Sequence, residues 1–333
     1  MIVARPFTVS EPGDTARARR AAAAAARALG FDDHDAARAA LVATEAATNL
    51  IRHAGGGELL LAAAGGGDAP VLRLFALDRG PGFVEEVARR DGYSTAGGAG
   101  TGLGAIARAC DRFDLYSRPD SGTVLFCEMA ARGARPPERA RFRVGGFSVA
   151  KPGEEVCGDG WAIHQQDRLL RLVLLDGLGH GAGAAEAARV GLEAFRQEPT
   201  LAPAAQIDRL HECMRPTRGA AAAVVQLDAG RGEVTFAGVG NTQGILDDGD
   251  RARHLGPDNG TLGHEVTRVR ESAYPWSPNG LLMLATDGLT TRLGLSAYPG
   301  LRRHAPDLVA AVLYRDFRRG RDDATVLVVV EAT

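Results

Sequence analysis

The chain has few cysteines and no paired cysteine motif. Only four cysteines occur among its 333 residues, and no two of them are spaced C-x-x-C. This pattern argues against a disulfide framework and against a zinc site built from thiolates. It is typical of a protein that stays in a reducing compartment. The sequence therefore predicts a cytoplasmic location.

Long hydrophobic runs and an excess of charge are also lacking. The alanine-rich stretch 21–26 is flanked by arginines and is far too short to span a bilayer. The first residues show no signal-peptide pattern. The formal net charge is −2, so no field favours nucleic acid or an anionic membrane surface. We expect neither as a partner.

Length and composition predict two globular domains. The chain is 45% hydrophobic and 24% charged, which is ordinary for a soluble protein, and its length suits about two domains. The segment 132–141 is basic, contains proline and lacks periodicity, which is typical of a linker. The predicted domains are therefore 1–131 and 142–333.

Hydrophobic periodicity predicts α+β layers in both domains. In the first domain the expected strands are Ala4–Ser10, Glu58–Ala64, Val71–Leu77, Arg112–Ser117 and Thr123–Ala130. The expected helices are Thr15–Leu29, His34–His53, Phe83–Arg90 and Leu103–Asp111. In the second domain the expected strands are Phe142–Ala150, Gly160–Gln165, Leu169–Asp176, Ala220–Leu227, Glu233–Gly238, Gly244–Leu246, Leu281–Ala285 and Thr325–Val330. The expected helices are Ala182–Arg196, Pro203–Met214 and Pro306–Arg318.

The first domain contains polar residues that share one helix face. Glu45, Asn49 and His53 are spaced i, i+4 and i+8, so a helix stacks them. A carboxylate, an amide and an imidazole in this arrangement can hold a magnesium ion, phosphate oxygens and an attacking hydroxyl. When they stand alone, a glutamate and an asparagine on one helix face are most often a solvated face.

Two glycine-rich motifs follow this helix. Asp78 ends an apolar strand and leads into Gly80 and Gly82, whose lack of a side chain lets the backbone approach a flat ligand. Asp78 can then accept a hydrogen bond from an exocyclic amine. The second motif precedes a helix, whose free N–H groups can cradle phosphates; it comprises Gly100, Thr101, Gly102, Leu103 and Gly104. The order and spacing of all three motifs together predict a nucleotide site.

These motifs resemble the N, G1 and G2 boxes of the GHKL ATPases, and among them the anti-sigma-factor and stress-switch serine kinases. The resemblance covers nearly all of 1–130 and implies a Bergerat sandwich of helices on a mixed sheet. It implies ATP and Mg²⁺, with Asn49 on the metal, Asp78 on adenine and the 100–104 loop on the phosphates. By the same resemblance, Glu45 orients or deprotonates a serine or threonine hydroxyl of a partner protein. The segment 91–99 would form a lid.

Four aspartates of the second domain lie at the boundaries of predicted core strands. They are Asp159, Asp176, Asp287 and Asp322. Hard carboxylate oxygens, few histidines and no thiolate pair suit Mg²⁺ or Mn²⁺ rather than zinc. Two such ions about 3.5–4 Å apart can activate a water and stabilise in-line displacement at phosphorus. Turn formation explains any one strand-end aspartate, but all four together favour a two-metal site.

The segments 155–159, 176–181, 237–241, 286–288 and 322–326 resemble the SpoIIE-type branch of the PPM protein phosphatases. The resemblance covers about 142–331 and implies an αββα sandwich that hydrolyses phosphoserine or phosphothreonine on a protein. It places two Mn²⁺ or Mg²⁺ ions on Asp159, Asp176, the Gly177 carbonyl, Asp287 and Asp322. Asp159 and Asp176 are the implied catalytic acids, and Asp323 is an alternative to Asp322.

The second domain departs from the PPM pattern in two respects. Cys157 stands where small or hydroxyl residues are usual. No arginine near the first acid matches the phosphate-binding arginine of the large eukaryotic members, which leaves substrate positioning open. His180 lies in the glycine-rich turn after Asp176, where either a general acid or a structural residue fits, and the structural interpretation is favoured. Asn241 also fits a structural role.

Two functional hypotheses remain open. The leading one is a bacterial partner-switching regulator, in which the first domain phosphorylates a STAS-type antagonist or stressosome protein and the second removes the mark. In the alternative, the first domain is only an ATP-gated module that binds a partner, such as a sigma factor, or gates the phosphatase. Glu45 favours the kinase, because binding alone needs no base. Kinases of this family are often dimers, so a homodimer is compatible with both hypotheses.

Overall fold

The computed structural model describes residues 2–64, 70–84, 102–133 and 140–332. They form two compact units, which are described separately. The first unit contains 2–138 and 303–315, and the second contains 139–302 and 316–333. The predicted boundary in 132–141 falls largely outside the described residues and stays a prediction. No helix in the described part of the chain is long and apolar enough to cross a bilayer.

The first unit contains a five-stranded sheet in the order β1-β2-β3-β5-β4. Its strands are β1 (Ala4–Val9), β2 (Gly57–Ala64), β3 (Val71–Leu77), β4 (Arg112–Ser117) and β5 (Thr123–Ala130). All four described pairings are antiparallel, so the expectation of a mixed sheet was wrong. The two strands of each pair, β2 with β3 and β4 with β5, are consecutive strands of the chain, which makes antiparallel pairing the natural outcome.

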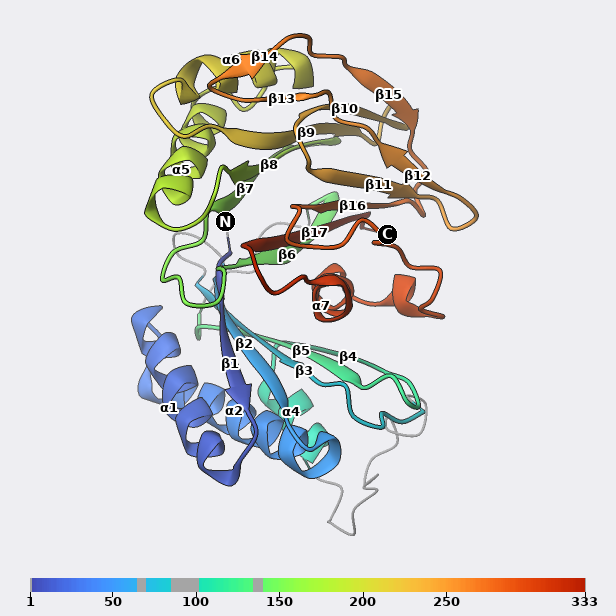
Figure 1. The fold of residues 1–333 in the computed structure, drawn as a ribbon. Coiled ribbons are helices and arrows are strands. Elements are labelled where there is room, and N and C mark those ends of the chain that lie inside the picture. Colours follow the sequence, from blue (N-terminus) through green and yellow to red (C-terminus); the bar gives the residue numbers. More distant parts are fainter. Residues whose placement is uncertain (1, 65–69, 85–101, 134–139, 333) are drawn as a thin grey trace. The chain divides into compact units, whose positions relative to one another are not determined.

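Three helices in the described part of this unit cover one face of the sheet (Figure 1). They are α1 (Pro12–Ala28), α2 (Asp33–Ala54) and α4 (Gly102–Ala109). Alanines at helical spacing, such as Ala22 and Ala43, are buried between α1, α2 and the sheet. Small side chains allow helices to approach closely, which explains the alanine richness of this region. Asp32 caps the start of α2, and Gly55 ends it with a φ of 71°.

The second unit contains two five-stranded antiparallel sheets. One has the order β15-β10-β9-β8-β7 and the other β12-β11-β16-β17-β6. The first sheet comprises β7 (Asp159–Gln166), β8 (Leu169–Gly177), β9 (Ala220–Asp228), β10 (Glu233–Val239) and β15 (Ser272–Pro275). The second comprises β6 (Phe142–Val149), β11 (Gln243–Asp247), β12 (Ala252–Leu255), β16 (Leu281–Ala285) and β17 (Ala324–Glu331). A short ribbon joins β13 (Gly260–Thr261) to β14 (Glu265–Val266).

Two helices pack on the β7–β10 sheet. They are α5 (Ala182–Gln197) and α6 (Pro203–Met214), and their apolar faces share a core with β8, β9 and β10. Pro203 occupies the first turn of α6, where its missing N–H costs nothing. This unit therefore shows the helix, sheet and sheet layers of the predicted α+β sandwich.

The last helix is grouped with the first unit. It is α7 (Pro306–Phe317), preceded by the short 3₁₀ turn η1 (Leu301–Arg303). Asp307 of α7 forms an ion pair of 2.7 Å with Arg73 of β3, and both side chains are largely buried. Arg73 also binds Glu128 of β5 at 2.8 Å. The sequence predicted α7 itself but not this grouping.

The predicted elements otherwise agree with the structure to within a few residues at their ends. Four short strands of the second unit, β12 to β15, were not predicted, because their polar, exposed residues lack alternation. The predicted helix 83–90 begins with two non-helical residues, and the rest lies outside the described residues. The segment 65–68, read as a hairpin, also lies outside them.

Candidate active sites

Glu45 and Asn49 of α2 face the start of α4. A Cβ placed on Gly102 would lie 3.2 Å from Oε2 of Glu45 and 3.5 Å from Oδ1 of Asn49. Both side chains are partly buried, whereas His53 is exposed. The structure therefore brings the Glu45 and Asn49 motif against Gly102, which is the first described residue of the 100–104 motif. Gly102 leaves room there that any larger residue would fill.

Asp78 lies at the end of β3 with one carboxyl oxygen already bonded. Its Oδ1 accepts the backbone N–H groups of Gly80 at 2.9 Å and of Thr123 at 3.0 Å. No hydrogen bond to its Oδ2 occurs among the described residues. Burial raises the pKa of Asp78, although the two N–H groups, Arg315 and His53 act against this shift. One oxygen is thus anchored, and the other remains for the amine predicted to bind there.

Arg315 of α7 also belongs to the surroundings of Asp78. Its guanidinium donates a hydrogen bond of 2.9 Å to the backbone carbonyl of Asp78. In return, Arg79 donates to the carbonyl of Arg315. No sequence pattern indicated this contact, because more than two hundred residues separate its partners.

The G1 glycines are required by close backbone contacts. A Cβ on Gly80 would lie 2.6 Å from Cα of Ala54, and Gly82 has a φ of 59°. Gly104 lies in the first turn of α4, where a Cβ would lie 3.1 Å from Nη1 of Arg108, and Leu103 precedes it. Gly100, Thr101 and the predicted lid 91–99 lie outside the described residues. The site is therefore described only up to its phosphate loop.

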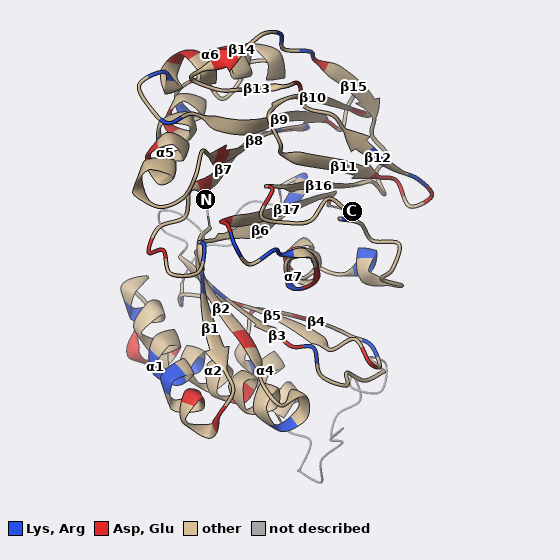
Figure 2. Ribbon diagram, viewed as in Figure 1, with Lys and Arg blue, Asp and Glu red and all other residues tan. Residues whose placement is uncertain are grey.

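In the second unit, Asp159 and Asp176 are cross-strand partners. Asp159 begins β7 and pairs in register with Asp176 near the end of β8 (acidic residues are red in Figure 2). The N–H of Gly177 donates to the carbonyl of Gly158 at 3.2 Å. Antiparallel register therefore places two predicted acids and the predicted Gly177 ligand together.

Asp287 comes to the same place from the other sheet. Its backbone N–H hydrogen-bonds the Asp176 carboxyl, and Nδ2 of Asn241 donates to its Oδ2 at 2.7 Å. Asn241 follows β10, so it holds Asp287 from the opposite sheet. We assign it to orienting this carboxylate, a role that its position after Gly-Val-Gly did not specify.

The aspartates raise one another's pKa values. Burial, followed by the charges of Asp287, Asp322 and Asp323, raises the pKa of Asp176 to about 7. Burial and Asp176 raise the pKa of Asp159, and burial and Asp322 raise that of Asp287. Such mutual repulsion shows that the carboxylates converge on a shared volume. A divalent cation would remove the repulsion.

Asp322 and Asp323 have different surroundings. Asp323 is buried, and its two oxygens accept the N–H groups of Lys151 at 2.8 Å and Gly158 at 3.0 Å. Asp322 is only partly buried and, within the described part of the chain, accepts just the N–H of its own neighbour at 3.0 Å. Asp323 therefore holds the loop that carries Asp159. Asp322 has fewer hydrogen bonds than Asp323 among the described residues, and its role as the metal ligand stays a prediction.

The donor set suits magnesium or manganese. Every candidate ligand is an oxygen, which these ions prefer. The aspartates do not form a group whose ligand atoms all lie within 4.8 Å of one another in the described part of the chain. A two-metal site needs a wider set, because ions about 3.5–4 Å apart spread their ligands over a longer span. The residues present thus fit a pair of ions.

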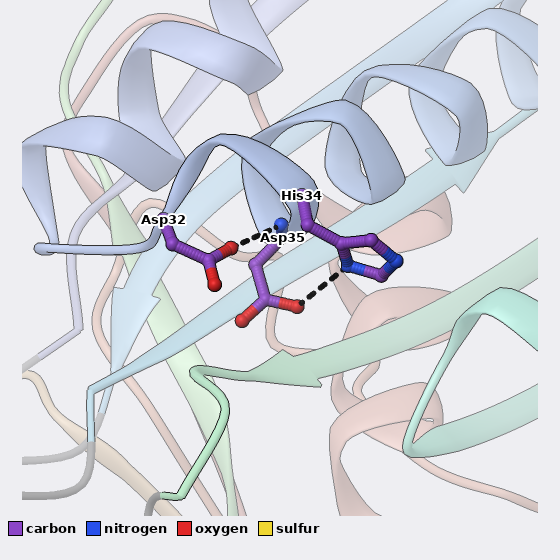
Figure 3. Close-up of side chains that lie close together, drawn as sticks. All are labelled: Asp32, His34 and Asp35. Atoms are coloured by element: carbon purple, nitrogen blue, oxygen red, sulfur yellow. Dashed lines mark hydrogen bonds and ion pairs between the residues drawn. The ribbon is translucent and has the colours of Figure 1, made fainter.

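A tighter group of acidic and imidazole side chains lies at the start of α2. It consists of Asp32, His34 and Asp35 (Figure 3). Asp32 accepts the N–H of Asp35 at 2.7 Å as a helix cap. Asp35 also lies 3.5 Å from the Arg38 guanidinium and accepts the N–H of Arg132 at 2.8 Å. Because an arginine already compensates the buried carboxylate, we assign this group to helix capping.

His180 lies in the turn 177–183, which carries the predicted Gly177 ligand and is called the metal loop below, and it is paired with an acid. Its Nδ1 lies 2.6 Å from Oε1 of Glu154, and both side chains are partly exposed. A Cβ on Gly181 would lie 2.9 Å from the other oxygen of Glu154. The pair ties the loop before α5 to the segment before β7.

Burial raises the pKa of Cys157, with the charges of Asp159 and Asp323 adding to it, so this thiol stays protonated.

Comparisons with known proteins identify both halves. The family described as histidine kinase-like ATPase domain matches residues 8–127, and the family described as stage II sporulation protein E (SpoIIE) matches residues 166–330. The serine/threonine-protein kinase RsbT of Bacillus subtilis (strain 168) is 34% identical over 113 residues, which cover 34% of this chain and 85% of RsbT.

The second half is similar to a phosphatase. Phosphoserine phosphatase RsbX of Bacillus subtilis (strain 168) is 24% identical over 160 residues, which cover 47% of this chain and 76% of RsbX. The crystal structure of RsbX in complex with magnesium has a TM-score of 0.51 and 20% identity, and covers 59% of this chain and 98% of that one. That likeness shows the fold. The chain belongs to the RsbT-type family of GHKL switch kinases through its first half, which is fused to a SpoIIE-type PPM phosphatase domain.

Proposed function

We propose that the chain is a bifunctional partner-switching regulator. Its first half phosphorylates a serine or threonine of a STAS-type partner with ATP, and its second half hydrolyses that phosphate with divalent metal ions. The observation that carries the proposal is the convergence of Asp159, Asp176 and Asp287 from two different sheets. An intact acid cluster of this kind is expensive to bury and serves a cation.

In the phosphatase half, Asp159, Asp176, the Gly177 carbonyl, Asp287 and Asp322 would hold two Mg²⁺ or Mn²⁺ ions. When bound, the ions supply charge stabilisation of the phosphoryl oxygens and lower the pKa of a coordinated water. Thr286 and Asn241 keep two of the carboxylates in place. Precise placement of these oxygens matters because displacement at phosphorus depends mostly on alignment and charge.

In the kinase half, Asp78 would bind adenine through its Oδ2, and Asn49 would help to hold Mg²⁺. Glu45 would orient or deprotonate the partner's hydroxyl. Its position beside Asn49 and Gly102 supports this role, since the phosphate loop includes Gly102. Phosphoryl transfer needs positioning and charge stabilisation more than covalent chemistry, which a carboxylate and an amide can supply. Similarity to RsbT over 85% of that kinase supports transfer rather than binding alone.

The partner is proposed from both halves together. RsbT is a kinase and RsbX a phosphoserine phosphatase, and similarity to both supports a chain that writes and erases one mark. A STAS or stressosome protein with a phosphorylatable serine or threonine is the class that such a cycle would serve. A sigma factor bound by the first half is the alternative partner.

The test uses the purified full chain with Mn²⁺ or Mg²⁺ and phosphoserine STAS proteins from the same genome. Phosphate release should require the metal and should be lost in Asp176→Asn, while ATP-dependent phosphorylation of the unmodified STAS protein persists in that variant. Release that continues in Asp176→Asn would contradict the metal assignment. If no STAS protein becomes phosphorylated but ATP and a sigma factor bind, the first half is a binding module.

A further inference from the structure

Arg218 is an exposed residue whose guanidinium lies against the 177–183 turn and pairs with no acid among the described residues. A Cβ placed on Gly183, in the first turn of α5, would lie 2.6 Å from Cζ of Arg218. A Cβ on Gly179 would lie 3.6 Å from its Nη1. The guanidinium thus rests on the 177–183 turn, and Gly183 is the residue that makes room for it. Only a glycine fits there without displacing the arginine.

The backbone at this arginine is tied to the metal loop. The carbonyl of Gly219 accepts the N–H of Leu178 at 3.0 Å, and Ala220 pairs in register with Gly177. Nε2 of His264 forms a hydrogen bond of 2.8 Å with the Arg218 carbonyl. Arg218 therefore lies two residues before Ala220, the strand partner of the predicted metal ligand Gly177. Its side chain starts from a defined position.

No structural partner accounts for this charge. Among the described residues, no hydrogen bond or ion pair engages the Arg218 guanidinium. By contrast, Arg215 on the same connection pairs with Glu212 at 2.7 Å. Helix α5 does not explain the placement either, because the start of a helix repels a cation. An arginine in these surroundings is suited to an anion that arrives from solution.

The loaded site would need such a cation. Asp159, Asp176, Asp287 and Asp322 carry about four negative charges, which two divalent ions would balance. A phosphoserine then adds about 1.5–2 negative charges. Arg319 and Arg321 lie near Asp287 and lower its pKa, so their charge already acts on a carboxylate. No ion pair joins Arg218 to an acid in the part of the chain that the structure describes.

We propose that Arg218 binds the phosphate group of the phosphoprotein substrate at the edge of the metal loop. This inference rests on the proposed phosphatase function. It supplies the phosphate-binding arginine that the sequence lacks near its first acid, from the α6–β9 connection. A guanidinium matches phosphate with two parallel N–H donors, which a lysine cannot reproduce.

The first experiment measures binding of inorganic phosphate to the Mn²⁺-loaded full chain by calorimetry, so it does not depend on turnover. Arg218→Ala should weaken phosphate binding about ten- to hundredfold, and Arg218→Lys should restore only part of it. Arg215→Ala is the matched control and should bind like the wild type. Mn²⁺ affinity should stay the same or rise in Arg218→Ala, because a nearby positive charge is removed. Weaker Mn²⁺ binding would indicate damage to the loop and overturn the proposal.

The second experiment follows hydrolysis of a phosphoserine peptide. Here kcat/KM should fall about tenfold or more in Arg218→Ala, with the control unchanged. Unchanged phosphate binding in Arg218→Ala, or a larger loss in Arg321→Ala, would overturn the assignment. A wild type that binds Mn²⁺ and phosphate but hydrolyses no phosphoprotein would instead contradict the proposed function, while the phosphate titration would still decide the role of Arg218.

Discussion

The hydroxyl of Thr286 donates a hydrogen bond of 2.8 Å to Oδ2 of Asp159, joining the two sheets of the second unit. Thr325 donates to the same oxygen, also at 2.8 Å. Two hydroxyls from the β16–β17 side therefore fix one oxygen of a carboxylate on β7. No hydrogen bond to Oδ1 of Asp159 occurs among the described residues, so this oxygen can face a cation.

Thr286→Val should weaken Mn²⁺ binding about ten- to hundredfold, because a residue that orients a ligand is lost. The free energy of unfolding should also fall by about 1–3 kcal/mol, since the buried carboxylate loses one donor. Thr286→Ser keeps the hydroxyl and should stay close to the wild type. Calorimetric titration with Mn²⁺ and chemical denaturation measure the two effects. Equal metal affinity in the valine and serine variants would contradict the orienting role.

Asp322→Asn and Asp323→Asn should separate metal binding from stability. Asp322 is the proposed ligand, so its variant should lose metal affinity with little change in metal-free unfolding. Asp323 accepts two backbone N–H groups, so its variant should lose about 1–3 kcal/mol of unfolding free energy. The same titration and denaturation experiments serve here. The reverse pattern would show that the two neighbours have exchanged roles.

Glu45→Gln should abolish most phosphoryl transfer to the partner while ATP still binds. The amide keeps the size of the side chain but cannot accept the hydroxyl proton, and general-base catalysis contributes about a hundredfold or more. Transfer is measured with labelled ATP, and binding with a fluorescent nucleotide. Asp33→Asn, at the exposed start of the same helix, is the control. Full transfer by the glutamine variant would leave only a binding role for Glu45.

The metal-free chain should lose stability as pH rises. The pKa of Asp176 is about 7 in the folded state, because of burial and neighbouring carboxylates, against about 3.9 when unfolded. A raised pKa stabilises the fold fully below about pH 4, and this contribution disappears as pH rises through about 7. Between pH 5 and 8 the unfolding free energy should fall by up to about 3 kcal/mol.

This pH dependence is measured by denaturation in chelator. Saturating Mg²⁺ should remove it, since the cation takes over the role of the proton. Asp176→Asn should flatten the metal-free profile. A metal-free wild type with the same stability at pH 5 and pH 8 would show that the carboxylates do not converge.

Much of the fold could be predicted because its signals are local. The apolar run of β3 and the alanine spacing in α1 each depend on a few neighbouring residues. The acids were recognisable for the same reason, since Asp176 and Asp287 each follow an apolar run. The short strands β12 to β15 carry no such pattern. β12 and β15 pair with the edges of the two sheets, and β13 and β14 pair with each other.

The sequence by itself determined the two domain families, the order of the main elements and the candidate residues of both sites, since these depend on short motifs and their spacing. The tertiary structure decided which of Asp322 and Asp323 has more hydrogen bonds, and that Thr286 and Asn241 orient the carboxylates. It also placed Arg218 on the metal loop. Each of these contacts joins residues far apart in the chain, so strand register and sheet packing set them rather than local propensity.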